Sequence, residues 1–303
     1  MSDRLVTVVI PTYNSAHLLR RALDSVMKQT HENWEALVVD NSSTDDTDAV
    51  VAGMGDPRIR MFKVKNEGVI AKSRNMAIRE AKGHWVAFLD ADDWWSRDKL
   101  EVSVRELLKG VDIVYHDLWH AGPRSRYSFR RVIRTRPLKN PVHRDLVLFG
   151  NALLNSSVVV RRDILLEIGG LNENPRLVAA EDFECWLRIA KQTEKFHRIP
   201  GIYGYYWIGS GNTSSAERTL TCLTELRNRY LDWDGERAMS SPAWLTFALG
   251  KANFELGNKK AAWFELGRVD FVGGNMPAWL KLKFVFLRWL IRASMMRTTA
   301  TEN

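Results

Sequence analysis

The sequence predicts an α/β fold, because strand-like and helix-like patterns alternate along roughly its first third. Short runs rich in β-branched residues end in polar residues, and segments with apolar residues at helical spacing separate them. This alternation is typical of a mostly parallel sheet with helices on both faces. The 303 residues are enough for one sizeable α/β domain and a smaller appendage.

The expected elements follow one another closely. Strands are predicted at residues 5–10, 36–39, 59–64, 85–89 and 111–115, and helices at 18–26, 69–81 and 96–108. Asn14 or Ser15 is the expected N-cap of the first helix, and the polar run 41–46 is expected to form a turn and a helix start. A strand at 151–161 and an amphipathic helix at 181–190 come later, and the chain beyond residue 216 is expected to be helical.

Polar residues directly follow three of the predicted strands. Pro11-Thr12-Tyr13-Asn14 closes the first strand, Asp40-Asn41 the second, and Asp90-Ala91-Asp92 the fourth. In sheets of this kind, ligands bind beyond the carboxyl ends of the strands. The topology alone therefore predicts a ligand site where these three polar segments converge.

The composition indicates a packed globular protein with a basic surface. Hydrophobic residues make up 45% of the chain, and 44 Lys and Arg outnumber 36 Asp and Glu, which gives a formal charge of +8. A basic surface favours anionic partners such as nucleotides, diphosphates and acidic lipids. No DNA- or RNA-binding motif accompanies the charge, so nucleic acid is not the expected partner.

Cysteine usage and apolar patterning favour a cytoplasmic protein. Cys185 and Cys222 form neither a disulfide framework nor a CxxC pair, which favours a reducing compartment. The first residues lack the features of a signal peptide. The longest uncharged stretch, 199–216, is too rich in Gly, Ser, Asn and Pro for a transmembrane helix. Peripheral contact with the inner face of the cell membrane stays open.

Asp90-Ala91-Asp92 is the sharpest local motif. Two carboxylates one residue apart at a strand end can bind different groups, one a divalent metal and the other a ribose hydroxyl. Mg²⁺ and Mn²⁺ prefer such oxygen ligands and share their coordination with phosphates. The alternative is a helix-capping acid cluster ahead of Trp94-Trp95.

Two further acidic positions each allow two interpretations. Asp40 is either a turn former at a strand end or an acceptor for a nucleobase N–H. Glu181-Asp182 is either a charged helix start or the position of a general base for an acceptor hydroxyl. The residues alone leave both alternatives open.

Together these motifs resemble the family 2 glycosyltransferases, which have the GT-A fold. The resemblance covers about residues 6–215 and rests on ordered blocks at 8–14, 19–29, 38–45, 66–75, 88–93, 169–171 and 181–188. Asn41 and Ser42 replace the Asp-Gly that is common in the family. Each block alone is weak, but their common order is very specific. The resemblance implies a mixed sheet flanked by helices, with a GT-A domain over 1–216 and a smaller helical region over 217–303.

The resemblance also implies a function: inverting transfer of a sugar from a nucleotide-diphosphate sugar, most often UDP-linked, to a hydroxyl acceptor, with Mn²⁺ or Mg²⁺ as cofactor. A saccharide or lipid-linked saccharide acceptor in cell-surface polysaccharide or glycolipid assembly is expected. The residues that it assigns to the nucleotide sugar are Pro11, Thr12, Tyr13, Asp40, Arg74, Asp90, Ala91 and Asp92.

Within that set, Asp40 would read the base, Arg74 would approach the base or the diphosphate, Asp90 would contact ribose or sugar, and Asp92 would ligate the metal. Asp182 would be the catalytic base, with Glu181 beside it. The family often carries a His about 25 residues after the base. Here that region holds none, so Ser210, Asn212 or the Gly-rich backbone are the expected replacements.

Two other functions compete with this interpretation. A nucleotidyltransferase that makes sugar nucleotides would carry a Gly-rich loop with Arg and Lys after the first strand, where 11–14 stands here. A non-catalytic module that only binds nucleotide sugars would not need all four acids, and Asp40, Asp90, Asp92 and Asp182 are all present. Both patterns favour the transferase.

Three segments outside the blocks carry their own expectations. Residues 118–144 hold eight Lys or Arg and no acid, and are expected to form an irregular or hairpin insertion. Its basic part, 124–144, is either a solvated face or a contact for an anionic acceptor. Residues 249–262 resemble one tetratricopeptide-like helical hairpin. Residues 277–297 carry five cations and no acid among large apolar residues. This last segment is either an interfacial membrane helix or a terminal helix docked on the body.

Overall fold

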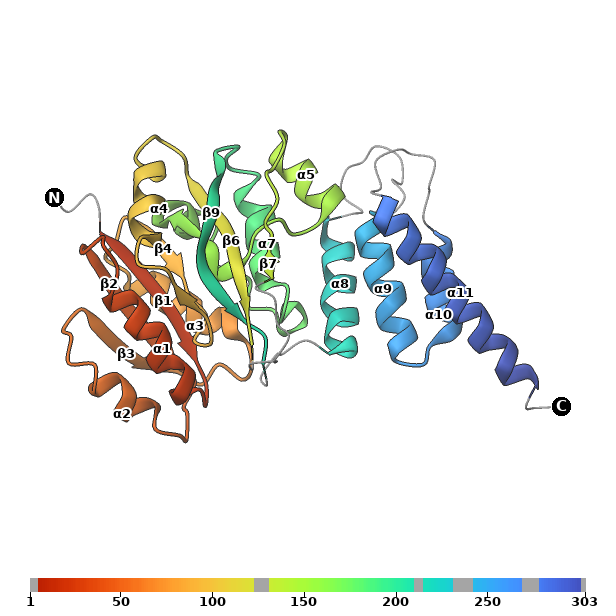
Figure 1. Ribbon diagram of the computed structural model, residues 1–303, viewed down its shortest axis with the longest axis horizontal. Helices are drawn as coiled ribbons and strands as arrows, with labels where there is room; N and C mark the ends of the chain where they lie inside the picture. Colours follow the sequence, from red (N-terminus) through yellow and green to blue (C-terminus); the bar gives the residue numbers. More distant parts are fainter. Residues whose placement is uncertain (1–4, 123–130, 210–214, 231–241, 269–277, 301–303) are drawn as a thin grey trace. The chain divides into compact units, whose positions relative to one another are not determined.

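The computed structural model describes residues 5–122, 131–209, 215–230, 242–268 and 278–300 (Figure 1). These residues form two compact units. The first comprises 1–143, 151–175 and 181–212, and the second comprises 144–150, 176–180 and 213–303. The first unit holds the sheet. The predicted domain boundary after residue 216 stays a proposal.

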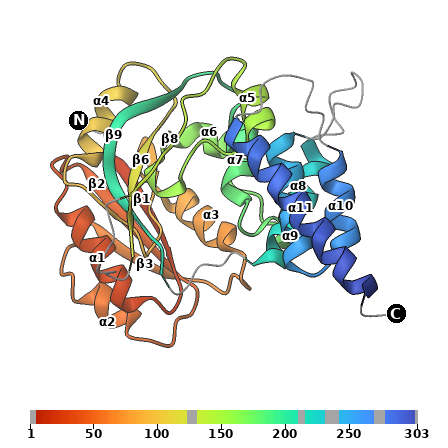
Figure 2. The ribbon, with the colours of Figure 1, turned by 45° about the vertical axis from the view of Figure 1, so that its right-hand side comes forward.

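Four parallel strands form one half of the sheet, as the sequence predicts. β1 (Val6–Thr12) pairs with both β2 (Trp34–Asp40) and β4 (Trp85–Phe88), and β2 pairs with β3 (Ile59–Lys63). The helices α1 (Ala16–Met27), α2 (Thr47–Ala52) and α3 (Ile70–Glu80) connect them. Figure 2 shows α1 and α3 on opposite faces of these strands. The predicted βα alternation of this half is confirmed.

The other half of the sheet is mixed. The short strand β8 (Val159–Arg161) runs antiparallel between β4 and β6 (Ile113–Ala121), and β6 pairs in parallel with β9 (Phe196–Trp207). β5 (Trp94–Trp95) pairs antiparallel with β9. The sheet is therefore less parallel than the opening alternation predicts, and it has the mixed character that the family resemblance implies.

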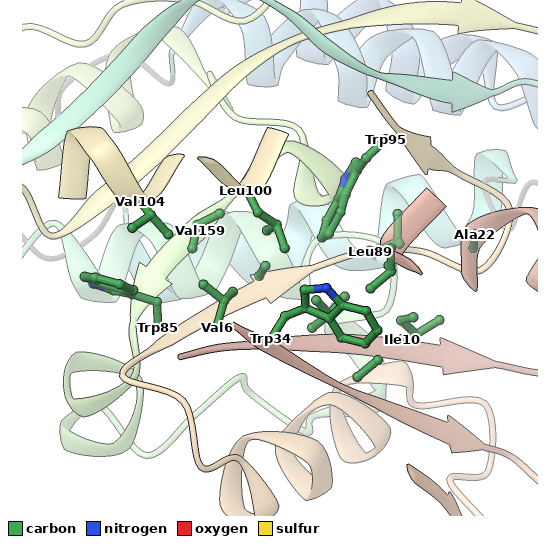
Figure 3. Packing of buried hydrophobic residues seen from close by; sticks show 14 of the residues in the cluster. Val6, Ile10, Ala22, Trp34, Trp85, Leu89, Trp95, Leu100, Val104 and Val159 are labelled. Carbon is green, nitrogen blue, oxygen red and sulfur yellow. The ribbon is translucent and has the colours of Figure 1, made fainter. Parts of the chain in front are cut away.

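The core lies between the sheet and the helices α1 and α4 (Lys99–Leu107). Side chains of alternate β1 residues, such as Val6 and Ile10, pack with Trp34, Leu89 and Leu100 (Figure 3). Val6 and Ile10 face the same helices because successive side chains of a strand point to opposite faces of the sheet, so every second one lies on the same side. Full burial of one such aliphatic side chain stabilises the fold by about 1.5–3 kcal/mol.

The segment between β6 and the helix α7 (Glu181–Ile189) differs in part from expectation. β7 (Val132–Ile133) pairs antiparallel with β6, which confirms the hairpin alternative for 118–144. The helix α5 (Val142–Phe149) was not predicted. Of the expected strand over 151–161, only Val159–Arg161 is a strand (β8); residues 151–154 have no regular structure, Asn155–Ser157 form a 3₁₀ turn, and α6 (Arg162–Glu167) follows β8 directly.

The second unit is helical. It holds α8 (Ala216–Tyr230), α9 (Ala243–Glu255), α10 (Lys259–Gly267) and α11 (Ala278–Ala300). α9 and α10 form the expected hairpin around Gly257, whose φ of 80° favours glycine. Gly250 lets the two helices approach, because a Cβ there would lie 2.6 Å from Cγ of Leu266. Among the described residues, no helix is both long and apolar enough to span a membrane.

Candidate active site

The three polar strand ends meet at one edge of the sheet. Thr12 lies opposite Asp40 in the parallel pairing of β1 and β2, and β1 also pairs with β4, after which Asp90-Ala91-Asp92 follows. The amide of Leu89 donates to the carbonyl of Val9 and continues this pairing to the end of β4. The predicted convergence is therefore present in the structure.

A network around Asp40 fixes the loop after β2. The Asp40 carboxylate is fully buried and accepts hydrogen bonds from the backbone N–H and the hydroxyl of Ser43. Asn14, in the left-handed region at φ 45°, accepts from the Thr44 N–H at 2.8 Å. These contacts tie the end of β1 to the end of β2.

Residues beside Asp40 place a buried hydroxyl and an exposed aromatic ring at this edge of the sheet. The Thr12 hydroxyl is buried and has no hydrogen-bond partner among the described residues. The Tyr13 side chain is 56% exposed. Ser15 occupies the N-cap position of α1, one of the two expected, but the Asp45 carboxylate accepts the hydrogen bond from the Ala16 N–H. The arrangement offers polar atoms and an aromatic surface to a planar ligand.

Arg74 joins the strand-end acids to the start of α7. It is only 3% exposed, and its Nη2 lies 2.7 Å from Oδ1 of Asp90 while its Nη1 lies 2.6 Å from Oε1 of Glu181. Burial alone would lower the pKa of Arg74, but Asp90 and Glu181 raise it above its usual value. Asn155 donates a further hydrogen bond to Asp90 at 3.0 Å. Both Nη groups contact carboxylates, and the approach of Arg74 to a base or diphosphate that the resemblance implies stays a prediction.

Asp92 and Asp93 crowd two more carboxylates into the same region. Burial, and then the charge of Asp90, raise the pKa of Asp92 to about 6. Burial and the charges of Asp90 and Asp92 raise the pKa of Asp93 as well. Asp93 accepts from the Trp207 N–H at 2.8 Å, and its other oxygen is buried without a hydrogen-bond partner among the described residues.

This acid cluster fits a hard divalent cation by the chemistry of its donors. Carboxylate oxygens that repel one another are stabilised by a cation between them. Among the described residues, no set of three or more His, Cys, Asp or Glu side chains has the geometry of a metal site. The metal-binding role of Asp92 stays a prediction.

Arg21 is a site residue that the sequence did not indicate. Its guanidinium carbon lies 3.6 Å from the ring centre of Trp94 and 4.8 Å from that of Trp207, and its Nη2 donates to the Asp92 carbonyl at 2.7 Å. Asp92 thus receives a hydrogen bond from α1, 71 residues earlier in the chain. The only signal in the sequence is the aromatic character of the two segments that enclose this cation.

Asp182 stands in the first turn of α7, where the helix dipole favours an acid. Its Oδ1 accepts from the Phe183 N–H at 2.6 Å, and the side chain keeps partial solvent exposure. Burial, and then the neighbouring charge of Glu181, raise the pKa of Asp182 to about 7, against the opposing effect of Arg74. A carboxylate with this pKa is well matched to proton transfer near neutral pH.

A clasp between α3 and the chain ahead of α7 supports these acids. The Asn75 side chain accepts from the Leu171 N–H at 2.8 Å and donates to the Leu171 carbonyl at 2.8 Å. Gly170 has a φ of 76°, and a Cβ there would lie 2.4 Å from the Asn75 amide oxygen. The clasp therefore requires glycine at position 170. This contact joins the sequence blocks 66–75 and 169–171 and gives a physical reason for Asn75 in the first and Gly170 in the second.

The expected replacements for the downstream His cannot be placed. Ser210 and Asn212 lie outside the described residues. His197, upstream of them on β9, lies 3.7 Å from Glu106 of α4.

Solved structures share the fold of this chain. It superposes on S. aureus TarS 1–349 in complex with UDP-GlcNAc with a TM-score of 0.59 and 17% identity, over 97% of this chain and 92% of that one. This likeness confirms the predicted GT-A fold.

Sequence relatives point to the same family. An uncharacterised glycosyltransferase of Rickettsia felis is 34% identical over 189 residues, which are 57% of this chain and only 31% of the relative. The E. coli UDP-Glc:alpha-D-GlcNAc-diphosphoundecaprenol beta-1,3-glucosyltransferase WfgD is 40% identical over 109 residues, 36% of this chain and 43% of the relative. The chain thus spans less than half the length of either. Residues 7–165, just over half of the chain, match the model of glycosyl transferase family 2, and the chain belongs to that family.

Proposed function

We propose that this chain transfers a sugar from a UDP-linked nucleotide-diphosphate sugar to an acceptor hydroxyl with inversion at the anomeric carbon. One observation carries the proposal. The strand-end acid Asp90 and the acid pair that opens α7 are joined through a single buried Arg74, within 2.7 Å on both sides. Donor-binding and proton-accepting groups therefore belong to one connected site.

The donor would bind along the carboxyl ends of β1, β2 and β4. Pro11, Thr12 and Tyr13 would line the base, and Asp40 would accept from a base N–H. Asp90 and Ala91 would contact ribose or sugar. Two similar proteins support a UDP-linked donor, because WfgD is named as a UDP-Glc-dependent glucosyltransferase and TarS was solved with UDP-GlcNAc.

The chemistry would be a single displacement. The acceptor oxygen forms a bond to the anomeric carbon while the bond from that carbon to the diphosphate oxygen breaks, and the acceptor proton passes to the Asp182 carboxylate. Glu181 holds Arg74 and so keeps a counter-charge beside this base. Attack from the face opposite the diphosphate inverts the anomeric centre.

Asp92 is the residue that would hold a divalent cation, Mn²⁺ or Mg²⁺, when the donor is bound. Such a cation supplies charge neutralisation for the departing diphosphate. The raised pKa of Asp92 and the crowding of Asp93 beside it support this assignment. For Arg74 we propose a positioning role, which replaces the nucleotide contact that the resemblance implies.

A saccharide or lipid-linked saccharide is the proposed acceptor, in cell-surface polysaccharide or glycolipid assembly. The support is the similarity to WfgD, which is named for an acceptor sugar on diphosphoundecaprenol. A peripheral position on a membrane would bring the chain to such an acceptor. The family match disfavours the nucleotidyltransferase alternative. The binding-module alternative differs from the proposal in predicting no turnover.

A donor screen tests the proposed function. The full chain is incubated with UDP- and GDP-linked sugars and Mn²⁺, and released nucleoside diphosphate is measured. We expect slow hydrolysis of one preferred donor, with most of the release lost in EDTA. Tight binding of a nucleotide sugar without release from any donor, even with added lipid-linked saccharides, would favour the binding module.

Metal-dependent donor binding should require Asp92. We expect UDP to bind at least tenfold more weakly without Mn²⁺ or in Asp92→Ala, which corresponds to about 1.4 kcal/mol. Because the cation binds the ionised carboxylate and the pKa of Asp92 is about 6, UDP affinity in Mn²⁺ should fall as pH drops through 6. Isothermal calorimetry at pH 7.5 and pH 5 measures both effects.

The control for this experiment is Asp24→Ala, which removes a partly exposed acid that pairs with Arg20 on α1. It should bind UDP like the original chain, with the same dependence on Mn²⁺. Equal UDP affinity with and without the metal would remove Asp92 from the metal site.

A further inference from the structure

The helix α11 is docked on the second unit by one face. Phe284 and Ile291 are fully buried, and with Leu287 they pack against Ala262 and Leu266 of α10. Nζ of Lys259 donates to the Ser294 carbonyl at 3.1 Å. The docked alternative for this segment is therefore correct for this face of the helix.

A second apolar face of α11 remains exposed. Phe286 and Trp289 are 61% and 62% exposed, and their rings stack with centroids 6.1 Å apart. At 100° per residue, the exposed apolar side chains share an arc of about 100°. They are Leu282, Val285, Phe286, Trp289 and Met296. A docked helix needs only one apolar stripe, so this outer stripe is not explained by the packing of the unit.

Cations border the outer stripe. On the helical wheel, Lys281, Arg288 and Arg292 lie between the outer stripe and the docked face on one side, and Lys283 lies between them on the other. Arg288 also lies over the Trp263 ring at 4.5 Å. No acid occurs in 277–297. The outer face is thus an apolar strip with positive borders.

We propose that this outer face of α11 binds the surface of an anionic phospholipid bilayer. The helix would lie in the plane of the interface, with Phe286 and Trp289 about 5–10 Å into the boundary between headgroups and acyl chains. Each cation near an anionic leaflet strengthens such binding about fivefold. The charges favour a bilayer over a second copy of the chain, because two outer faces brought together would place like charges side by side.

Membrane binding by α11 is separate from the proposed sugar transfer, because it needs no sugar nucleotide and is measured without one. The structure also limits the proposed membrane contact to one face of the segment 277–297. The aromatic pair at 286 and 289 makes the contact, whereas Phe284 belongs to the interior of the unit.

Vesicle co-sedimentation of the full chain tests the proposal. Vesicles of phosphatidylcholine alone and with one third phosphatidylglycerol are compared in 50 mM and 1 M NaCl. We expect binding to the anionic vesicles at low salt and at least a tenfold weaker partition at 1 M, where the Debye length is about 3 Å. The double variant Phe286→Ser/Trp289→Ser should lose at least tenfold in partition at low salt.

Phe264→Ser is the matched control. Phe264 is a 66% exposed aromatic residue on α10 with Arg268 nearby, so it tests whether any exposed ring has the same effect. This variant should bind vesicles like the original chain, and circular dichroism should show native helicity in all variants. Equal sedimentation of the double variant and the original chain would overturn the proposal. Size-exclusion chromatography that shows a dimer lost in the double variant, without vesicle binding, would overturn it in favour of self-association.

Discussion

Asp182→Asn is expected to slow sugar transfer by about 10²–10⁴-fold while UDP affinity stays within about twofold of the original. The amide keeps the shape of the side chain and can still accept the hydrogen bond from the Phe183 N–H, but it cannot take a proton from the acceptor. The substitution should therefore lower kcat and leave donor binding nearly unchanged. Turnover with the donor and acceptor identified by screening, together with calorimetric titration of UDP, measures the two quantities.

The pH profile gives the same prediction a second readout. Since the pKa of Asp182 is raised to about 7, the base is ionised above that pH and protonated below it. We therefore expect kcat of the original chain to rise as pH increases through about 7, and the residual activity of Asp182→Asn to lack this rise.

Asp163→Asn is the matched control for the base. Asp163 also stands in the first turn of a helix and accepts from the next residue, with its Oδ1 2.8 Å from the Ile164 nitrogen. This variant should keep normal turnover. If Asp182→Asn retained near-normal turnover as well, the base would lie elsewhere, and Glu181→Gln would be the next variant to measure.

The parts of the site that follow from local order were predictable from the sequence. Asp40 and Asp90 could be placed at one edge because alternating strands and helices make neighbouring strands parallel, and parallel strands end on the same side. The position of Asp182 at a helix start followed from the amphipathic pattern of 181–190. Its role as a base came only from the family resemblance, and it stays a proposal.

The contacts that connect these residues were not predictable, because they join distant positions. Arg74 and Glu181 are 107 residues apart, and Arg21 and Asp92 are 71 apart. Nothing local to α3 shows that its arginine faces two carboxylates rather than a ligand. The position follows from packing of α3 against the sheet and from the Asn75 clasp, both of which are tertiary.

The elements that the sequence did not predict correctly were missed for a local reason. The apolar run within 151–161 suggested a strand, but only Val159–Arg161 pairs with neighbouring strands, since the preceding residues turn at Asn155–Ser157. The helix α5 follows two prolines, at 137 and 141, that made the segment look irregular. Helix and strand cannot be separated by short apolar runs alone.

Arg74→Met should produce the second large effect, on both stability and pH dependence. The change leaves the buried Glu181 and the partly exposed Asp90 without their shared cation, and loss of one partner from a buried ion pair typically costs about 3–5 kcal/mol. The midpoint of urea unfolding should fall accordingly. Arg74→Lys retains the charge but cannot contact both carboxylates in the same geometry. Its urea midpoint should lie between those of the original chain and Arg74→Met.

The sign of the pH effect separates a positioning role from a nucleotide contact. The charge of Arg74 lowers the pKa of Asp182, so its removal raises that pKa above about 7. The rise of kcat with pH should then move to higher pH in Arg74→Met, with activity partly recovered there, while UDP affinity stays nearly unchanged. A purely structural defect would lower kcat at every pH without moving the profile. Weaker UDP binding at an unchanged pH profile would instead return Arg74 to the base or the diphosphate, as the family resemblance implies.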